Sequence, residues 1–313
     1  MIQVEDLVVA YGDFEAVHSV SLTVPAGSAV GLAGPNGAGK TSLMRAVCGL
    51  LVPRSGRCLV GGVDVQSDPA RVHACIGYMP DFFGLYDHLY VWEYLEFFGQ
   101  VYHMPEAKLR KRIDEVLGLT DLGGKRDALV GELSRGMKQR LCMGRALLHD
   151  PGVLVLDEPA SGVDPRGRYE IRQMLTRLAS TDKTILVSSH ILPELSEVCD
   201  SLAIMESGRL VASGSLEEIG HELSGIRVMT MRILDGRAQR VPELLADMPA
   251  VAEVQVSGDS AEVRVADSDE AVADLLARLT AAGIRIGGVT ERRADLEQLY
   301  LQLTEGTLAQ VGP

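Results

Sequence analysis

The feature that most constrains this chain is the segment Gly34–Thr41 (GPNGAGKT), which fits the pattern G-x-x-x-x-G-K-[S/T] at every position. A short apolar segment precedes it, as expected of a buried strand, and a helix-forming segment that ends at Gly49 follows it. Glycines let a backbone wrap closely around an anion, and the free amides at a helix start point towards it. The alternative is a glycine-rich turn that only caps a helix. The pair Lys40 and Thr41, with a strand before and a helix after, favours a loop that binds a nucleoside triphosphate.

The chemistry of such a loop gives its side chains separate tasks. Lys40 is expected to reach the β- and γ-phosphates, and the Thr41 hydroxyl is expected to hold Mg²⁺. The residues predicted to contact the nucleotide through the loop and the helix start are Asn36, Gly37, Ala38, Gly39, Lys40, Thr41 and Ser42.

Two adjacent carboxylates, Asp157 and Glu158, follow the apolar segment Val153–Leu156. Buried strands rarely end in paired acids unless the charges meet a cation or a proton. Asp157 is therefore expected to hold Mg²⁺, and Glu158 to act as the general base that polarises an attacking water. The alternative, an exposed strand end, is less consistent with the phosphate-binding loop upstream.

Four further residues have both a structural and a functional interpretation. His190 follows the apolar segment Thr184–Ser188 and could hydrogen-bond a γ-phosphate, although a lone histidine is usually structural. Ser134 and Asp164 each stand where a helix N-cap belongs, and Ser134 could also help to bind a second anion at a helix start. Tyr11 could stack on a purine ring or be an ordinary tyrosine at a strand end.

Composition limits the classes of protein to which this chain can belong. At 313 residues it can hold one large domain and a second, smaller one. A net charge of −13 argues against a nucleic-acid-binding protein, so no nucleic-acid partner is expected. Five scattered cysteines without C-x-x-C indicate a reducing, cytosolic setting. The sequence contains neither a recognisable signal peptide nor an apolar run of about eighteen residues, so we do not expect it to span a membrane.

Aromatic residues are concentrated in one stretch, because ten of the fourteen in the chain lie between Tyr78 and Tyr102. Interfaces concentrate Tyr, Trp and Phe, which favours a docking surface for a partner. A small helical subdomain with its own aromatic core explains the stretch equally well, and the two interpretations are compatible. Downstream, four apolar residues mark one face of an amphipathic helix: Leu109, Ile113, Val116 and Leu117.

After Ile219 the sequence changes character, because no lysine follows Lys183 and apolar residues fall into short segments. Their order predicts a strand, a helix, a hairpin of two strands around Gly258, a helix capped by Ser268, a strand and a last helix near Tyr300. This order is typical of a small ferredoxin-like α+β domain, here over residues 221–313. We assign no chemistry to it.

Taken together, residues 1–220 resemble the ATP-binding subunit of an ABC transporter, because six motifs of that family occur in the family's order. They are an adenine-stacking aromatic at Tyr11, the Walker A loop at 34–41, the signature at Leu133–Met137 (LSRGM), the Walker B acids Asp157 and Glu158, a D-loop at Ser161–Asp164 and a switch histidine at His190. The resemblance implies an α/β P-loop NTPase with a mixed sheet core, an antiparallel β subdomain and an α-helical subdomain at 78–135.

The same resemblance implies that the chain hydrolyses ATP with Mg²⁺ in a head-to-tail dimer with a second ATPase subunit. Ser134 and Gly136 would contact the γ-phosphate of the nucleotide on the partner, and Asp164 would couple the two sites. The implied catalytic residues are Lys40, Glu158 and His190. The subunit would lie on the cytosolic face of the membrane, where region 78–102 would receive a separate transmembrane permease.

Two sites in the sequence depart from the family's pattern. The signature has Arg135 and Met137 where the family has glycine and glutamine, while Ser134 and Gly136 remain. Asp81 stands where the family has the glutamine of the Q-loop. Its carboxylate could still coordinate Mg²⁺, but it adds negative charge near the phosphates.

The chain's closing segment, DLEQLYL at 295–301, resembles the end of the accessory domain of two-component ABC exporters, which favours export. The main alternative is a soluble ABC-family ATPase that acts on ribosomes or nucleic acid. Such proteins usually carry two cassettes or a long coiled coil, and no heptad run occurs between Lys40 and Ser134. A P-loop kinase or GTPase would leave the signature unexplained, and a non-hydrolytic module would be expected to lack Glu158 or His190.

Overall fold

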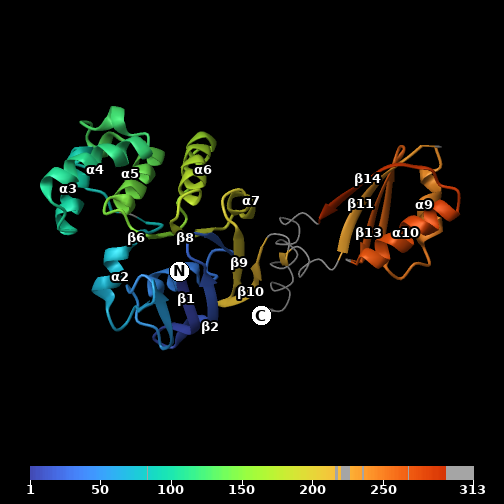
Figure 1. The fold of residues 1–313 in the computed structure, drawn as a ribbon, viewed down its shortest axis with the longest axis horizontal. Coiled ribbons are helices and arrows are strands. Elements are labelled where there is room, and N and C mark those ends of the chain that lie inside the picture. Colours follow the sequence, from blue (N-terminus) through green and yellow to red (C-terminus); the bar gives the residue numbers. More distant parts are fainter. Residues whose placement is uncertain (83, 216–217, 220–225, 235, 267, 294–313) are drawn as a thin grey trace. The chain divides into compact units, whose positions relative to one another are not determined.

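The computed structural model describes residues 1–82, 84–215, 218–219, 226–234, 236–266 and 268–293. The chain divides into two compact units after Ser215 (Figure 1). Each unit has a hydrophobic core of its own. Within this described part, we find no helix that combines the length and the apolar character needed to cross a membrane.

A six-stranded mixed sheet forms the centre of the first unit, in the order β10-β9-β3-β8-β7-β6. Its strands are β3 (Ala29–Ala33), β6 (Ile76–Met79), β7 (Val153–Leu156), β8 (Thr184–Ser189), β9 (Ser201–Glu206) and β10 (Arg209–Gly214). Neighbouring strands run parallel except for β9 and β10. β3, β7 and β8 are buried along their whole length, as near-continuous apolar runs predict. Because parallel strands end at one edge of a sheet, the segments that follow these three strands meet there.

A four-stranded antiparallel sheet, in the order β2-β1-β4-β5, shares its hydrophobic core with the central sheet. Its strands are β1 (Ile2–Tyr11), β2 (Phe14–Val24), β4 (Ser55–Val60) and β5 (Val63–Asp64). Helix α1 (Lys40–Val47) contributes Leu43 and Met44 to that core, and both are wholly buried. The start of α1 is thereby fixed beside the turn that joins β1 to β2.

The other helices of this unit are α2 (Pro69–Cys75), α3 (Val91–Val101), α4 (Glu106–Leu119), α5 (Arg135–Leu147), α6 (Pro165–Ala179) and α7 (Leu192–Ser196). α3, α4 and α5 pack on one another (Figure 1). The amphipathic face predicted for α4 is confirmed, since its four apolar residues Leu109, Ile113, Val116 and Leu117 are buried.

The aromatic stretch between Tyr78 and Tyr102 divides into a core part and a surface part. Tyr94 is wholly buried, and its ring lies edge-on to that of Phe98, with the centroids 5.0 Å apart. The exposed aromatics of the stretch are Phe82, Tyr86, Tyr90 and Phe97. Phe83 lies outside the described residues. The stretch therefore builds an aromatic core and also presents aromatic rings to solvent.

The second unit is a four-stranded antiparallel sheet, in the order β12-β13-β11-β14, with two helices packed on it. Its elements are β11 (Ile226–Ile233), α9 (Val241–Leu245), β12 (Val251–Ser257), β13 (Ser260–Ala266), α10 (Asp269–Ala281) and β14 (Ile286–Arg293). The predicted hairpin and cap are confirmed, because β12 and β13 flank Gly258 and the Ser268 hydroxyl accepts from the Ala271 N–H at 3.1 Å. The predicted last helix, near Tyr300, lies outside the described residues.

Candidate functional site

The backbone of the loop between β3 and α1 is closely packed at two of its glycines. Gly39 adopts a φ of 98°, in the left-handed region that glycine tolerates best, and a Cβ there would collide with the Ala16 carbonyl. A Cβ on Gly34 would collide with the Met205 carbonyl in the same way. Both glycines that the sequence pattern specifies are therefore required by the packing around them.

Lys40, the first residue of α1, is only 5% exposed. Its Nζ donates to the carbonyl oxygens of Gly34 at 2.6 Å and Pro35 at 3.2 Å, and it lies 3.3 Å from Oε1 of Glu158. A buried ammonium group needs such partners to offset its lost hydration. The cation is thus held inside the loop in advance, next to the predicted general base.

Asp157, directly after β7, is wholly buried. Its Oδ1 accepts a hydrogen bond from Ser188 Oγ at 2.7 Å, while Oδ2 has no hydrogen-bond partner among the described residues. A buried carboxylate oxygen without a partner is unfavourable unless a cation meets it. With the Thr41 hydroxyl in the adjoining cavity, the available oxygen ligands fit Mg²⁺, which prefers oxygen.

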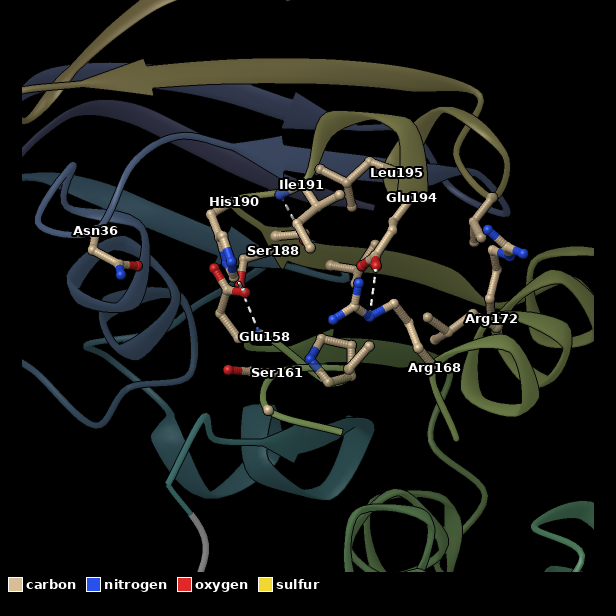
Figure 2. A pocket seen from close by; sticks show the side chains of 17 residues that line it. Asn36, Glu158, Ser161, Arg168, Arg172, Ser188, His190, Ile191, Glu194 and Leu195 are labelled. Atoms are coloured by element: carbon tan, nitrogen blue, oxygen red, sulfur yellow. Dashed lines mark hydrogen bonds and ion pairs between the residues drawn. The ribbon is translucent and has the colours of Figure 1, made fainter. Parts of the chain in front are cut away.

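Glu158 is the centre of a hydrogen-bond network at the ends of β7 and β8 (Figure 2). Its φ of 48° is left-handed, which in a residue other than glycine costs about 1–3 kcal/mol and is typical of functional sites. Its N–H donates to Ser188 Oγ at 2.9 Å, and its Oε2 lies 2.8 Å from Nδ1 of His190. With Lys40 near Oε1, these contacts fix the carboxylate between an ammonium group and an imidazole.

Ser188 is the residue of this network that sequence reasoning missed. It is wholly buried, and its hydroxyl donates to Asp157 and accepts from the Glu158 backbone, so one side chain positions both acids. The only available signal was that two serines, Ser188 and Ser189, end an otherwise apolar strand immediately before His190.

A cavity of about 290 Å³ opens over the loop and the start of α1. The residues that line it are Tyr11, Phe14, Ala16, Pro35, Asn36, Gly37, Ala38, Gly39, Lys40, Thr41, Ser42, Asp81 and Glu158. The Tyr11 hydroxyl lies 3.3 Å from Ser42 Oγ, which places its ring at the rim of the loop. Phe14, a second exposed aromatic at this rim, was not predicted, although it follows Tyr11 by only one tight turn.

Asp81 borders the same cavity as Glu158. Loss of hydration raises the pKa of the Asp81 carboxyl above its usual value, and the negative charges of Asp157 and Glu158 raise it further. Arg135, and after it Lys40, act in the opposite direction. The carboxyl of Asp81 therefore lies in the electrostatic field of the acid pair.

The signature residues line a different cavity, of about 530 Å³. Its lining residues are Asp121, Gly124, Lys125, Ser134, Gly136, Met137, Arg140, Asp164, Arg166, Gly167 and Glu170, so no P-loop residue is among those described as bordering it. Ser134 Oγ accepts from the Met137 N–H at 3.3 Å, and Asp164 Oδ1 accepts from the Gly167 N–H at 3.2 Å. Both residues are thus N-caps, as their structural interpretation predicts.

A third cavity, of about 280 Å³, is drawn in Figure 2. Asn36, Glu158 and His190 line it, and so does the ion pair of Arg168 Nε with Glu194 Oε1, which are 3.2 Å apart. Burial raises the pKa of Glu194 above its usual value. The two catalytic candidates that follow a strand, Glu158 and His190, therefore both line this cavity.

The structure gathers most of the predicted site residues and separates three of them. Twelve of the predicted residues either line the cavity over the P-loop or belong to the hydrogen-bonded group around Glu158. They are Tyr11, Asn36, Gly37, Ala38, Gly39, Lys40, Thr41, Ser42, Asp81, Asp157, Glu158 and His190. Ser134, Gly136 and Asp164 lie at the other cavity. Within one chain, the signature does not border the cavity over the P-loop.

Comparison with known proteins gives a consistent result. A family model described as ABC transporter matches residues 17–161. The Nod factor export ATP-binding protein I of Rhizobium sp. (strain N33) is 37% identical over 295 residues, which cover 94% of this chain and 94% of that protein. The linearmycin resistance ATP-binding protein LnrL of Bacillus subtilis (strain 168) is 31% identical over 310 residues, covering 98% and 99%.

A solved structure, described as the ATP-binding subunit of an ABC transporter, is similar with a TM-score of 0.65. It is 29% identical to this chain and covers 71% of it, and 92% of that structure is matched. The similarity to known proteins thus rests on sequence over nearly the whole chain and on the fold over most of it.

Proposed function

This chain belongs to the ABC transporter family of ATP-binding proteins, in which ATP hydrolysis is the shared activity, and from that premise we propose that it drives export through a separate membrane permease. Support for export comes from the Rhizobium relative, which is named for Nod factor export and matches this chain along nearly its full length. The identity of the exported molecule depends on the permease rather than on the residues of this ATPase.

The observation that carries the proposal is the position of Glu158 between Lys40 and His190. Glu158 accepts a proton from the attacking water. General-base catalysis requires that this water lie within hydrogen-bond reach of the Glu158 carboxylate. Lys40 leaves its loop carbonyls to neutralise the β- and γ-phosphates, and His190 hydrogen-bonds the γ-phosphate at the opposite side of Glu158.

ATP lies along the loop, with its phosphates on the backbone amides of Gly37–Thr41 and with Asn36 and Ser42 at the two ends. The adenine stacks on Tyr11, and Phe14 supplies a second aromatic surface at the same rim. Thr41, Asp157 and Asp81 would hold Mg²⁺, which would supply positive charge to the phosphates. Support for the metal comes from the partnerless buried Oδ2 of Asp157 in the described structure.

Two chains complete the site in a head-to-tail dimer. The separation of the signature cavity from the P-loop cavity supports this arrangement, because one chain by itself does not bring them together. Ser134 and Gly136 contact the γ-phosphate of the nucleotide on the partner. Asp164, at the end of the D-loop, couples the two sites.

The permease docks on the 78–102 region, and the chain therefore works at the cytosolic face of a membrane. Support comes from the aromatic rings that this region leaves exposed, among them Phe82 at 91% and Tyr86 at 52%. Exposed aromatic clusters of this kind are enriched at protein interfaces.

Within the second compact unit, which begins at Leu216, we take residue 220 as the domain boundary, so that residues 221–313 form a ferredoxin-like accessory domain. Support comes from the strand order β12-β13-β11-β14 with antiparallel neighbours, in which the first and third strands of the unit pair centrally. Together with the helices α9 and α10, this is the arrangement of a split βαβ fold.

The test is a pull-down of the tagged full-length chain from gently solubilised native membranes, with identification of the proteins that accompany it. We expect a multi-spanning membrane protein in stoichiometric amount. Replacing Phe82 and Tyr86 by serine should release that partner without changing ATP binding. Recovery only from the fraction without membranes, with ribosomes or with no partner, would contradict the export proposal.

A further inference from the structure

Two ion pairs join α6, the helix after the D-loop, to α7, the helix after His190. In the inner pair, Arg168 Nε lies 3.2 Å from Glu194 Oε1, and Figure 2 shows this pair among the side chains that line one cavity with His190. In the outer pair, one turn further along α6, Arg172 Nη1 donates to Glu197 Oε1 at 3.0 Å. Glu197 is not among the residues described as lining that cavity. Of the two pairs, the inner one therefore has both of its members at the cavity of the catalytic candidates.

The inner pair also has the more buried carboxylate. The Glu194 side chain is 16% exposed, whereas the Glu197 side chain is 55% exposed. Arg168 Nε and Glu194 Oε1 are both buried atoms, and neither makes a hydrogen bond within the part of the chain that the structure describes. Their ion pair is therefore the contact that offsets the lost hydration of both atoms. Loss of one member would leave the other buried without a partner, which favours a shift of one helix away from the other.

Backbone hydrogen bonds connect each member of the inner pair to a segment of the site. On α6, the Arg168 N–H donates to the carbonyl oxygen of Asp164, the last residue of the D-loop, at 3.0 Å. On α7, the Glu194 N–H donates to the carbonyl oxygen of Ile191 at 3.2 Å, and Ile191 directly follows His190. The inner pair thus links the D-loop to the segment that carries His190.

These links close into a ring at the predicted general base. The N–H of Ser161, the first residue of the D-loop, donates to the Glu158 carbonyl at 3.0 Å. At the other end of the ring, Nδ1 of His190 lies 2.8 Å from Oε2 of Glu158. The His190 side chain is 43% exposed, so burial alone does not hold its imidazole against Glu158. The position of this imidazole depends on the segment that carries it, and the inner pair anchors that segment through α7.

We propose that the inner pair, Arg168 with Glu194, holds His190 against Glu158 by fixing α7 to α6. Both residues act through the position of His190, so they are positioning residues rather than catalytic ones. Because the D-loop is proposed to couple the two sites of the dimer, the same pair would carry a displacement of that loop to His190. The inference rests on the proposed function, since it takes Glu158 and His190 as catalytic residues of ATP hydrolysis.

The test is the ATPase activity of the full-length chain, resolved into kcat and KM, together with the dissociation constant of MgATP. Glu194→Gln keeps the size of the side chain and removes its charge. It should lower kcat about tenfold, while KM and the dissociation constant stay within about twofold of the wild type. Arg168→Met should lower kcat to the same extent, and Arg168→Lys, which keeps a cation, should recover most of it. The double variant Arg168→Met/Glu194→Gln should fall no further than either single variant, because the two residues act as one pair.

Glu197→Gln is the matched control, because it makes the same substitution in the outer pair, whose carboxylate is exposed. It should leave kcat within about twofold of the wild type, as expected for an exposed ion pair, and circular dichroism should show every variant folded. The positioning role is wrong if Glu194→Gln leaves kcat unchanged or lowers it no more than Glu197→Gln does. It is also wrong if MgATP affinity falls as far as kcat does. A wild-type chain that binds MgATP but hydrolyses none would instead contradict the proposed function.

Discussion

The two halves of the proposed nucleotide site, the P-loop half around Lys40 and the signature half around Ser134, differ in how firmly the chain's own contacts hold them. In the P-loop half, Lys40 and Glu158 are nearly buried and hold each other in place. In the signature half, Ser134 stands exposed at the start of α5, and within the described part of the chain its hydroxyl is seen to make the local hydrogen bond of a helix cap. The difference indicates that contacts within the chain already hold the P-loop half, whereas the signature half has the form expected if, as proposed, a second chain completes it.

Lys40→Ala should have the largest effect, because it removes the buried cation from the preorganised half. Truncating one member of a buried charge pair costs about 2–5 kcal/mol, so ATP should bind at least about thirtyfold more weakly. The measurement is equilibrium binding of ATP. Lys111→Ala, which removes an exposed lysine of α4, is the control and should leave binding unchanged. If the Lys40→Ala variant still bound ATP tightly, the Lys40 ammonium group would not be needed for nucleotide binding in the P-loop half.

Glu158→Gln should separate binding from turnover within the same half. The amide keeps the size of the side chain but accepts no proton, so kcat should fall by about a hundredfold or more. ATP binding should persist, and sedimentation should show a nucleotide-bound dimer that accumulates. Hydrolysis near the normal rate would remove Glu158 from the role of general base.

Ser134→Asp should impair only the signature half, which we propose a second chain completes. Aspartate caps a helix as well as serine does, so α5 should remain folded, but its charge repels a γ-phosphate. ATP binding to the single chain should be unchanged. The kcat should fall by more than about tenfold, because one hydrogen bond to a charged group is lost and a repulsion that opposes dimer formation is added. A loss of ATP binding by the single chain would mean that the two halves are not separate.

Tyr11→Ala should have the smallest effect and should act on the adenine end of the P-loop half. Loss of an aromatic stack costs about 1 kcal/mol, or roughly fivefold in ATP affinity. Tyr11→Phe keeps the ring and loses only the hydroxyl contact with Ser42, so it should bind nearly as well as the wild type. Inorganic tripolyphosphate, which has no base, should bind both variants equally. If Tyr11→Ala weakened the binding of tripolyphosphate as much as the binding of ATP, Tyr11 would contact the phosphates rather than the adenine.

The P-loop half could be predicted from the sequence because its constraints are local. The spacing of Gly34, Gly39 and Lys40 marks the loop, and the acids Asp157 and Glu158 stand out because they end an apolar strand. Strand periodicity predicted the hairpin at Gly258 in the same way. Such features depend on residues that are near one another in the chain.

The residues that the sequence did not reveal act through contacts between distant segments. Ser188 joins two acids from the neighbouring strand, and serine at a strand end carries no signal of that task. The ion pair of Arg168 with Glu194 depends on how α6 lies against α7. The left-handed φ of Glu158 is likewise set by the network around it rather than by its own preference. Tertiary geometry had to supply these contacts.

The most direct test of the central claim, that nucleotide completes a site shared by two chains, is a mixing experiment. One chain carries Lys40→Ala and the other Ser134→Asp, both in a Glu158→Gln background and with different tags. A head-to-tail pair of these chains contains one intact P-loop opposite one intact signature. We predict that the mixture forms a mixed dimer that depends on MgATP, and that neither chain by itself forms a dimer with MgATP. Absence of the mixed dimer, or its formation without ATP, would contradict the account.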